Sequence, residues 1–211
     1  MLFRSLAARA PVHRDRLIGW LWPTLTPGAA DEALRQAVAA LADAIGQHRV
    51  RVDGRSLRLA LDAGDTWDIG DLLRLGAGAP ESGSDATVEA LTSALAAYAA
   101  PAFSEWPDAE WAVSIRRECA DALRRLRGRL AEALLADGRT EEALPHFAQL
   151  VEIDPQEEAW HRGLMRCHAR VGDTALALRQ FHACRSILRQ TRAADPSPET
   201  HALYLELLAR G

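Results

Sequence analysis

The sequence predicts a mainly α-helical fold that contains one β-hairpin, and three observations support this prediction. Over most of the 211 residues, apolar side chains recur three and four positions apart, which is typical of amphipathic helices. Over residues 49–61 the spacing changes to two, which is typical of paired strands. In the C-terminal half, a stretch of 18 residues recurs in part 34 positions later, which indicates a repeated helical unit.

The N-terminal part is predicted to form three short helices. Residues 2–10 and 15–22 each have a helical pattern, and a proline directly follows each segment. The third helix is expected to begin at Pro27, with Thr26 as its cap, because proline is favoured at the first helical position. Apolar side chains then continue at helical spacing as far as Gly46, where we expect the helix to end.

A β-hairpin with an arginine-rich face is predicted after the third helix. Apolar residues alternate with arginines over residues 49–52 and again over 57–61, and the dipeptide Asp53-Gly54 favours a turn between them. The hairpin arginines are Arg49, Arg51, Arg55 and Arg58. Three helices followed by a hairpin form the connectivity of a winged helix-turn-helix, in which the third helix enters the major groove of DNA.

The third helix and the hairpin carry the candidate DNA-binding residues. Arg35 and Gln36 lie near the start of the third helix, where they would meet base edges, and the four hairpin arginines would neutralise phosphates. Residues 1–62 carry nine arginines against six acidic residues, whereas the remainder carries sixteen against twenty-three. This asymmetry favours a polyanion-binding part joined to a protein-facing part. The alternative is a small helical domain with solvated arginines, because the third helix also carries Glu32 and Asp43.

Two domains are predicted on either side of a linker. Residues 77–85 are rich in Gly, Ser and Pro, which is typical of linkers, so we expect domains at 1–76 and 86–211. A short helix at about 69–75 would end the first domain. The second domain is predicted to contain only helices, at about 86–99, 107–137, 140–152, 156–171, 173–190 and 198–209.

The repeat lies within this second domain. The identical pairs are Leu130/Leu164, Gly138/Gly172, Thr140/Thr174, Ala143/Ala177, Leu144/Leu178 and Phe147/Phe181. The glycines would end one helix and turn into the next, the alanines would permit close packing, and the phenylalanines would fill the space between helices. A 34-residue period with this pattern is the signature of a tetratricopeptide-like helical hairpin. Such hairpins stack around a continuous core, which predicts a binding scaffold rather than a catalytic one.

Catalytic and metal-binding sites are weakly indicated. The candidates were His161, Cys167, His168, His182 and Cys184, but no pair has the tight spacing of a structural zinc site. The glutamates at 141, 142, 157 and 158 fall in first helical turns, where they favour the helix dipole. No phosphate-binding glycine motif, nucleophile elbow or metalloprotease motif occurs. We therefore expect no enzyme activity, no metal and no cofactor.

The cysteine content and the hydropathy of the sequence indicate the compartment in which we expect the protein. Three cysteines without a Cys-x-x-Cys motif argue against a disulfide framework, so we expect reduced, buried thiols. No apolar run approaches 18 residues, and the start does not resemble a secretory leader. These observations predict a cytoplasmic protein without a membrane span.

Several segments resemble a family of bacterial regulators. The segments are Arg14-Asp-Arg-Leu-Ile-Gly-Trp-Leu-Trp-Pro23, Ala30-Asp-Glu-Ala-Leu-Arg35 through Ile45-Gly46, and Arg51-Val-Asp-Gly-Arg-Ser-Leu-Arg-Leu59. They resemble the later part of an OmpR-type winged helix as it occurs in the antibiotic regulatory proteins called SARP. The second set is Asp137-Gly-Arg-Thr-Glu-Glu-Ala-Leu144, Gly172-Asp-Thr-Ala-Leu-Ala-Leu178 and Pro196-Ser-Pro-Glu-Thr200. With these motifs, residues 120–208 resemble the bacterial transcriptional activator domain of the same regulators.

The resemblance implies a transcriptional activator. In that family the winged helix binds double-stranded promoter DNA, and the helical domain supports homodimerisation and contact with RNA polymerase or other regulatory proteins. The family's winged helix begins with several strands, so we expect this one to be truncated at its N terminus. The family also carries arginines late in the recognition helix, where this chain has Ala40, Ala42 and Asp43. The alternatives are a protein-interaction module that has lost DNA binding and an enzyme that uses His168 or His182.

Overall fold

The computed structural model describes most of the chain. The described residues are 11–60, 62, 65, 67–78, 88–100 and 102–210. The helix predicted at 2–10 and most of the linker predicted at 77–85 lie outside them. The chain divides into two compact units, residues 1–74 with 100–121 and residues 75–99 with 122–211. The predicted domain limits at 76 and 86 stay a prediction.

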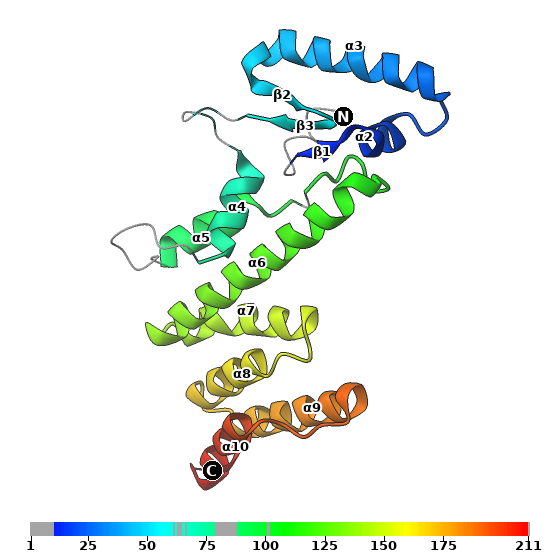
Figure 1. The fold of residues 1–211 in the computed structure, drawn as a ribbon. Helices are drawn as coiled ribbons and strands as arrows, with labels where there is room; N and C mark the ends of the chain where they lie inside the picture. Colours follow the sequence, from blue (N-terminus) through cyan, green and yellow to red (C-terminus); the bar gives the residue numbers. More distant parts are fainter. Residues whose placement is uncertain are drawn as a thin grey trace. The chain divides into compact units, whose positions relative to one another are not determined.

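Helices make up most of the described chain, which confirms the mainly α-helical fold class (Figure 1). They are α2 (Arg14–Leu21), α3 (Pro27–Ile45), the 3-10 turn η1 (Gln47–Arg49), α4 (Asp68–Gly76), α5 (Val88–Ala97), α6 (Glu110–Ala136), α7 (Thr140–Ile153), α8 (Glu158–Arg170), α9 (Thr174–Arg192) and α10 (Pro198–Arg210). The strands are β1 (Val12–His13), β2 (Val50–Asp53) and β3 (Ser56–Leu59). None of the helices in the described residues is long and apolar enough to cross a membrane.

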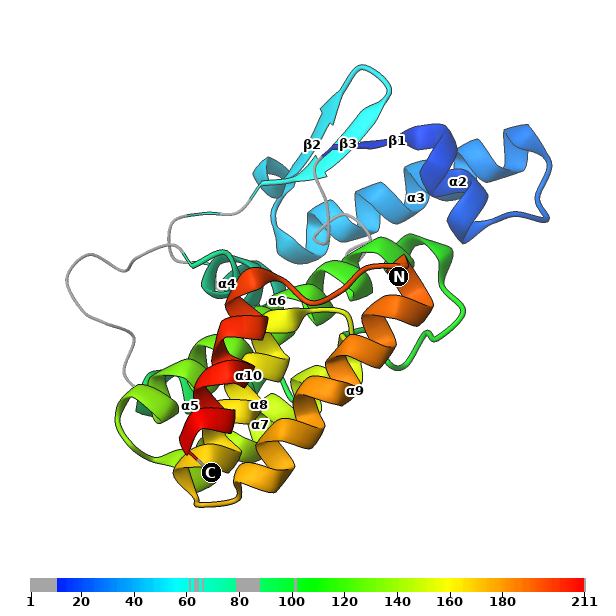
Figure 2. The same cartoon turned by 90° about the horizontal axis from the view of Figure 1, so that it is seen from below.

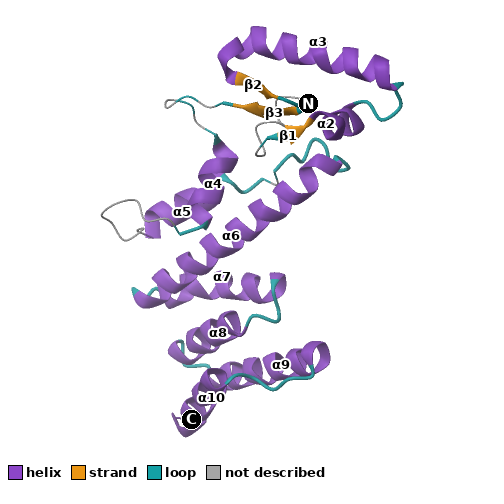
Figure 3. Cartoon of the chain, in the orientation of Figure 1, coloured by secondary structure: helices purple, strands orange, loops and turns teal. Residues whose placement is uncertain are grey.

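The strands of the first unit form one antiparallel sheet in the order β1-β3-β2 (Figure 3). The predicted hairpin is confirmed, and its turn residues are Gly54 and Arg55, one position later than predicted. Gly54 has a φ of 57°, a left-handed conformation that glycine adopts at no steric cost. Strand β1 was not predicted, because its two residues, Val12 and His13, are too few to show an alternating pattern.

The core of the first unit lies between α2, α3 and the sheet. Four side chains are buried together there: Val12 from β1, Leu17 from α2, Leu34 from α3 and Leu57 from β3. Each such side chain contributes roughly 1.5–3 kcal/mol by leaving water. This cluster holds α3 against the hairpin, so helix and hairpin form the paired surfaces of a winged helix-turn-helix.

The second unit consists mainly of helical hairpins, with α7, α8, α9 and α10 packed in succession (Figure 2). Gly138 and Gly172 have φ values of 79° and 87°, so both predicted turn glycines do occupy the left-handed region. The repeated alanines and phenylalanines are buried, as predicted: Ala143, Ala177, Phe147 and Phe181. The repeat in the sequence therefore corresponds to a repeat in the packing.

Candidate nucleic-acid interface

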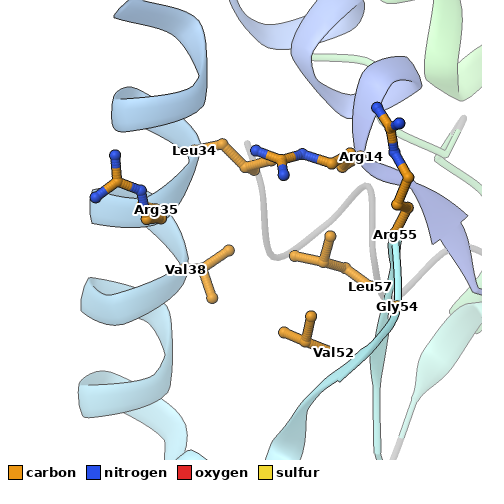
Figure 4. Close-up of a pocket in the computed structure, with 8 residues that line it drawn as sticks. All are labelled: Arg14, Leu34, Arg35, Val38, Val52, Gly54, Arg55 and Leu57. Atoms are coloured by element: carbon orange, nitrogen blue, oxygen red, sulfur yellow. The ribbon is translucent and has the colours of Figure 1, made fainter. Parts of the chain in front are cut away.

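A groove runs between α3 and the β2–β3 hairpin in the first unit (Figure 4). It has a volume of about 210 Å³ and is lined by Arg14, Leu34, Arg35, Val38, Val52, Gly54, Arg55 and Leu57. The apolar side chains of both elements point into the groove, and Arg14 extends across it toward α3. Val52 remains 61% exposed. The groove combines an apolar floor with a guanidinium rim.

The two predicted base-contacting residues lie on the exposed side of α3, and both bind the same carboxylate. Arg35 forms an ion pair with Glu32 one turn earlier. The side-chain amide of Gln36 donates to Glu32 Oε1 at 2.9 Å. Side chains three and four positions apart meet on a helix surface, so this arrangement is local to α3. Their predicted contact with bases stays a prediction.

Arg49 lies at the base of the hairpin, where two carboxylates bind it. Its guanidinium is 2.9 Å from Asp62 and 2.6 Å from Asp65, and its side chain is only 27% exposed. The pKa of Asp65 is lowered by the backbone N–H of Asp62, which donates to it, and by the hydrogen bond from Arg49. The hydrogen bond to Asp65 in turn raises the pKa of Arg49. This arginine connects the base of the hairpin to Asp62 and Asp65, and its predicted phosphate contact stays a prediction.

Arg55 and Arg14 meet where the hairpin turn touches the start of α2. Arg55 Nη2 lies 2.9 and 3.0 Å from the two carboxylate oxygens of Asp15. The backbone N–H of Arg14 donates to the carbonyl of Arg55 at 2.8 Å. The Arg14 guanidinium is 2.7 Å from Asp31 on α3. Sequence reasoning missed Arg14, because only the unpredicted pairing of β1 with β3 brings it to the groove.

Arg51 and Arg58 form the one directly opposed arginine pair between β2 and β3, and we call them the wing pair. They are cross-strand partners in the register, and both side chains are exposed. No ion pair joins either of them to any residue that the structure describes. Like charges directly opposite in a sheet are destabilising. A polyanion bound to this face would relieve that repulsion.

The second unit has two hollows that share Arg166 and Arg170 as lining residues. One has a volume of about 660 Å³ and is lined mainly by α8 and α10, and the other, of about 290 Å³, is lined by α6, α7 and α8. Both arginines are exposed, and Arg170 also donates to the carbonyl of Leu135. The two hollows supply a surface on which a protein segment could bind.

Of the residues considered for catalysis or metal binding, His161, Cys167 and Cys184 are buried in the core, whereas His168 is half-buried and His182 is exposed. Cys119, Cys167 and Cys184 are free and buried, and burial raises the pKa of each thiol to about 11. His161 is buried, and its ring nitrogens lie 2.9 Å from the Pro155 carbonyl and 2.6 Å from the Gln180 amide. Within the described ranges, no group of three His, Cys, Asp or Glu residues could hold a metal ion.

The chain is similar to a known protein family and to three known proteins. Residues 65–208 match the family model described as the bacterial transcriptional activator domain. The chain is 23% identical, over 96% of its length and 68% of theirs, to the transcriptional regulatory protein MoaR1 of Mycobacterium tuberculosis and to MoaR1 of Mycobacterium bovis. Its fold is similar to that of Mycobacterium tuberculosis EmbR, solved in complex with a low affinity phosphopeptide, with a TM-score of 0.76 and 20% identity. That match covers 99% of this chain but only 58% of the EmbR chain.

Proposed function

The chain belongs to the family of transcriptional regulators that carry the bacterial transcriptional activator domain, and from this premise we propose that it activates transcription by binding double-stranded promoter DNA. The first unit would bind the duplex, and the second would contact other proteins. We propose that the protein acts in the cytoplasm, without a cofactor and without catalysis.

The wing pair is the observation that carries this proposal. Arg51 and Arg58 present two neighbouring guanidinium groups, with no counter-charge among the described residues. Phosphates on the DNA backbone would supply that counter-charge and release bound cations from the duplex. The wing pair would therefore fix the position of the protein on DNA without reading its sequence.

Sequence would be read by α3. Arg35 and Gln36 lie on its exposed side, and arginine pairs well with guanine and glutamine with adenine in the major groove. Both side chains would first have to leave Glu32. This exchange is feasible because Arg35 is 73% exposed and surface ion pairs contribute only about 0–1 kcal/mol.

The second unit would serve dimerisation and contact with RNA polymerase or other regulatory proteins. The two hollows that share Arg166 and Arg170 support this part of the proposal, since stacked helical hairpins bind partners on such surfaces.

A protein-interaction module without DNA binding is the second candidate. One observation favours it: Arg35, Arg49 and Arg55 each bind at least one carboxylate of the chain itself. In addition, the later part of α3 offers Ala40, Ala42 and Asp43 in place of basic side chains.

A gel-shift experiment distinguishes the two candidates. The full chain is mixed with duplexes from the regions upstream of its neighbouring genes, in the presence of excess unrelated DNA. DNA binding predicts retardation of at least one duplex, which is lost in the double variant Arg51→Ala/Arg58→Ala. It predicts normal retardation for the control Arg117→Ala/Arg179→Ala, whose arginines are also exposed. No retardation of any duplex by the full chain, even at low salt, would favour the interaction module.

A further inference from the structure

We propose that Asp15, Asp31 and Glu32 are internal counter-ions of the groove between α3 and the hairpin, which restrain its affinity for DNA until the duplex displaces them, with phosphates replacing Asp15 and Asp31 and a base edge replacing Glu32. This inference rests on the proposed DNA-binding function and adds Arg14 to the residues that contact phosphate. The occupant assigned to the groove is one strand of the sugar–phosphate backbone.

Three arginines reach the groove from three separate elements. Arg14 begins α2, Arg35 lies on α3, and Arg55 is in the hairpin turn. Because the three residues are far apart in the sequence, the tertiary structure brings them together, and helix or strand periodicity does not. A phosphodiester strand that follows the groove could meet Arg14 and Arg55, and an adjoining base edge could meet Arg35.

Each of these arginines already binds an acid of the first unit. The pairs are Arg14 with Asp31 at 2.7 Å, Arg55 with Asp15 at 2.9 Å, and Arg35 with Glu32. Three cations and three anions cancel, so the groove has no formal net charge in this state. Its attraction for a polyanion is therefore far below what its arginine content suggests.

The carboxylates are placed for exchange rather than for permanent burial. The side chains of Asp15, Asp31 and Glu32 are 59%, 49% and 46% exposed, so water screens each pair. A phosphodiester presents two non-bridging oxygens, so an arginine can donate two parallel hydrogen bonds to it as it can to a carboxylate. A bound DNA strand can therefore replace each acid on its arginine, and the released carboxylate returns to water.

The groove floor fits the remaining part of such a strand. Leu34, Val38 and Val52 are apolar, and Val52 is largely exposed. Deoxyribose is the least polar part of the backbone and could cover these side chains. An amphipathic groove with arginines at its rim is thus complementary to alternating sugar and phosphate groups.

The test removes the counter-ions one at a time and measures DNA affinity across a salt series. The variants are Asp15→Asn, Asp31→Asn and Glu32→Gln, in the full chain, with a labelled mixed-sequence duplex as the probe. Controls Asp108→Asn and Glu118→Gln make the same charge change at exposed acids of the first unit that pair with none of the three groove arginines. Circular-dichroism melting verifies that every variant is folded.

We expect each groove variant to bind the duplex on the order of fivefold to tenfold more tightly at 0.1 M salt, with the slope of log K against log salt close to the wild-type slope, because the same phosphates are neutralised in the complex. The controls should change affinity much less and leave the slope unchanged. If the wild type binds DNA but the groove variants behave like the controls, the counter-ion inference is overturned while DNA binding stands. If neither the wild type nor any variant binds the duplex at low salt, the proposed function itself is overturned.

A second probe identifies the occupant. Polyglutamate, a chain with the charge of an acidic protein segment but without sugars, is titrated into the same variants. Tighter binding of the duplex alone supports the assignment. Tighter binding of polyglutamate with unchanged affinity for the duplex would contradict it and would assign the groove to an acidic protein partner.

Discussion

Single residues in the second unit are fixed by close packing, and Gly163 on α8 is the clearest case. A Cβ atom added there would lie 2.2 to 2.6 Å from the ring of Phe147, far inside van der Waals contact. Phe147 is buried and cannot move aside without opening the core. The sequence repeat identified Phe147 but not Gly163, because the glycine is needed for the approach of a neighbouring helix rather than for a turn.

Replacement of Gly163 by alanine should therefore lower the free energy of unfolding by about 1–3 kcal/mol. Urea denaturation followed by circular dichroism measures this change. The matched control is Gly19→Ala on α2, where an added Cβ meets no atom within 4 Å. That control should gain up to about 1 kcal/mol, because alanine loses less backbone entropy than glycine in a helix. Equal stability of Gly163→Ala and the wild type would show that the packing of α8 is looser than described.

Protonation of His161 should destabilise the protein. The Pro155 carbonyl can only accept, so Nε2 carries the proton and the bare Nδ1 accepts from Gln180. Burial lowers the pKa of His161 below 6.5, so the folded state binds a proton less readily than the unfolded state. The corresponding stability is complete above the unfolded pKa and is lost as the pH falls through the folded pKa.

Urea denaturation at about pH 7.5 and about pH 5.5 measures this dependence. The free energy of unfolding should be lower at the acidic pH than at the higher pH. This decrease should be smaller in His161→Gln than in the wild type. Part of the dependence should remain, because burial and Arg127 also lower the pKa of His146. The exposed His201 gives the control His201→Gln, which should retain the wild-type dependence. A dependence that His161→Gln leaves unchanged would rule out the role of this ring.

The predicted site residues show what sequence can and cannot provide at this scale. Arg35, Gln36, Arg51 and Arg58 were chosen from their positions on a helix and a hairpin, and all four are exposed, while their contact with DNA stays a prediction. The acids that bind Arg55 and Arg14 could not be predicted, since Asp15 lies 40 residues before Arg55 and meets it only after the sheet forms. Counter-ion pairing across elements is a property of the tertiary structure.

Among the elements, α10 is attached to the hairpins by a polar network rather than by apolar contacts alone. Glu158 at the start of α8 accepts from the backbone N–H of Ser197 at 2.9 Å and from its hydroxyl at 2.8 Å. Arg162 donates to the hydroxyl of the buried Thr200 at 2.9 Å. The segment Pro196-Ser-Pro-Glu-Thr200 therefore does more than begin a helix, because it joins α10 to α8.

A double-mutant cycle tests this attachment. Glu158→Ala and Ser197→Ala should each destabilise the second unit, and their effects should be coupled by about 1–3 kcal/mol, since the bond involves a charged acceptor. Hydrogen exchange should also accelerate in α10 before it does in α7. The exposed Glu152 provides the control Glu152→Ala, which should show no coupling to Ser197. Additive effects of Glu158→Ala and Ser197→Ala would mean that their contact does not hold α10.

Most of the described elements could be predicted, because their periodic patterns are long. The predicted helices at 140–152, 173–190 and 198–209 agree with α7, α9 and α10 to within two residues at each end. Strand β1 could not be predicted, since a two-residue strand is defined by its partner and not by its own sequence. Because β1 was not predicted, the position of Arg14 beside the groove was not predicted either.

For the molecule as a whole, charge is divided along the chain, with a basic N-terminal part and an acidic remainder. The described arginines of the first part lie on α2, α3, η1 and the hairpin. Four of them bind nearby acids, namely Arg14, Arg35, Arg49 and Arg55, whereas the wing pair has no counter-charge among the described residues. DNA binding by this chain should therefore depend chiefly on a few arginines. The family membership predicts regulation of transcription, and the wing pair predicts how the duplex is held.

The salt dependence of duplex affinity tests this account most directly. Fluorescence anisotropy of a labelled duplex, from about 50 to 200 mM salt, gives the slope of log K against log salt for the wild type and for Arg51→Ala/Arg58→Ala. The account predicts a steep negative slope for the wild type and a slope reduced in magnitude by about 1.8 in the double variant, about 0.9 for each lost phosphate contact. Equal slopes for the two proteins, or affinity that does not change with salt, would contradict it.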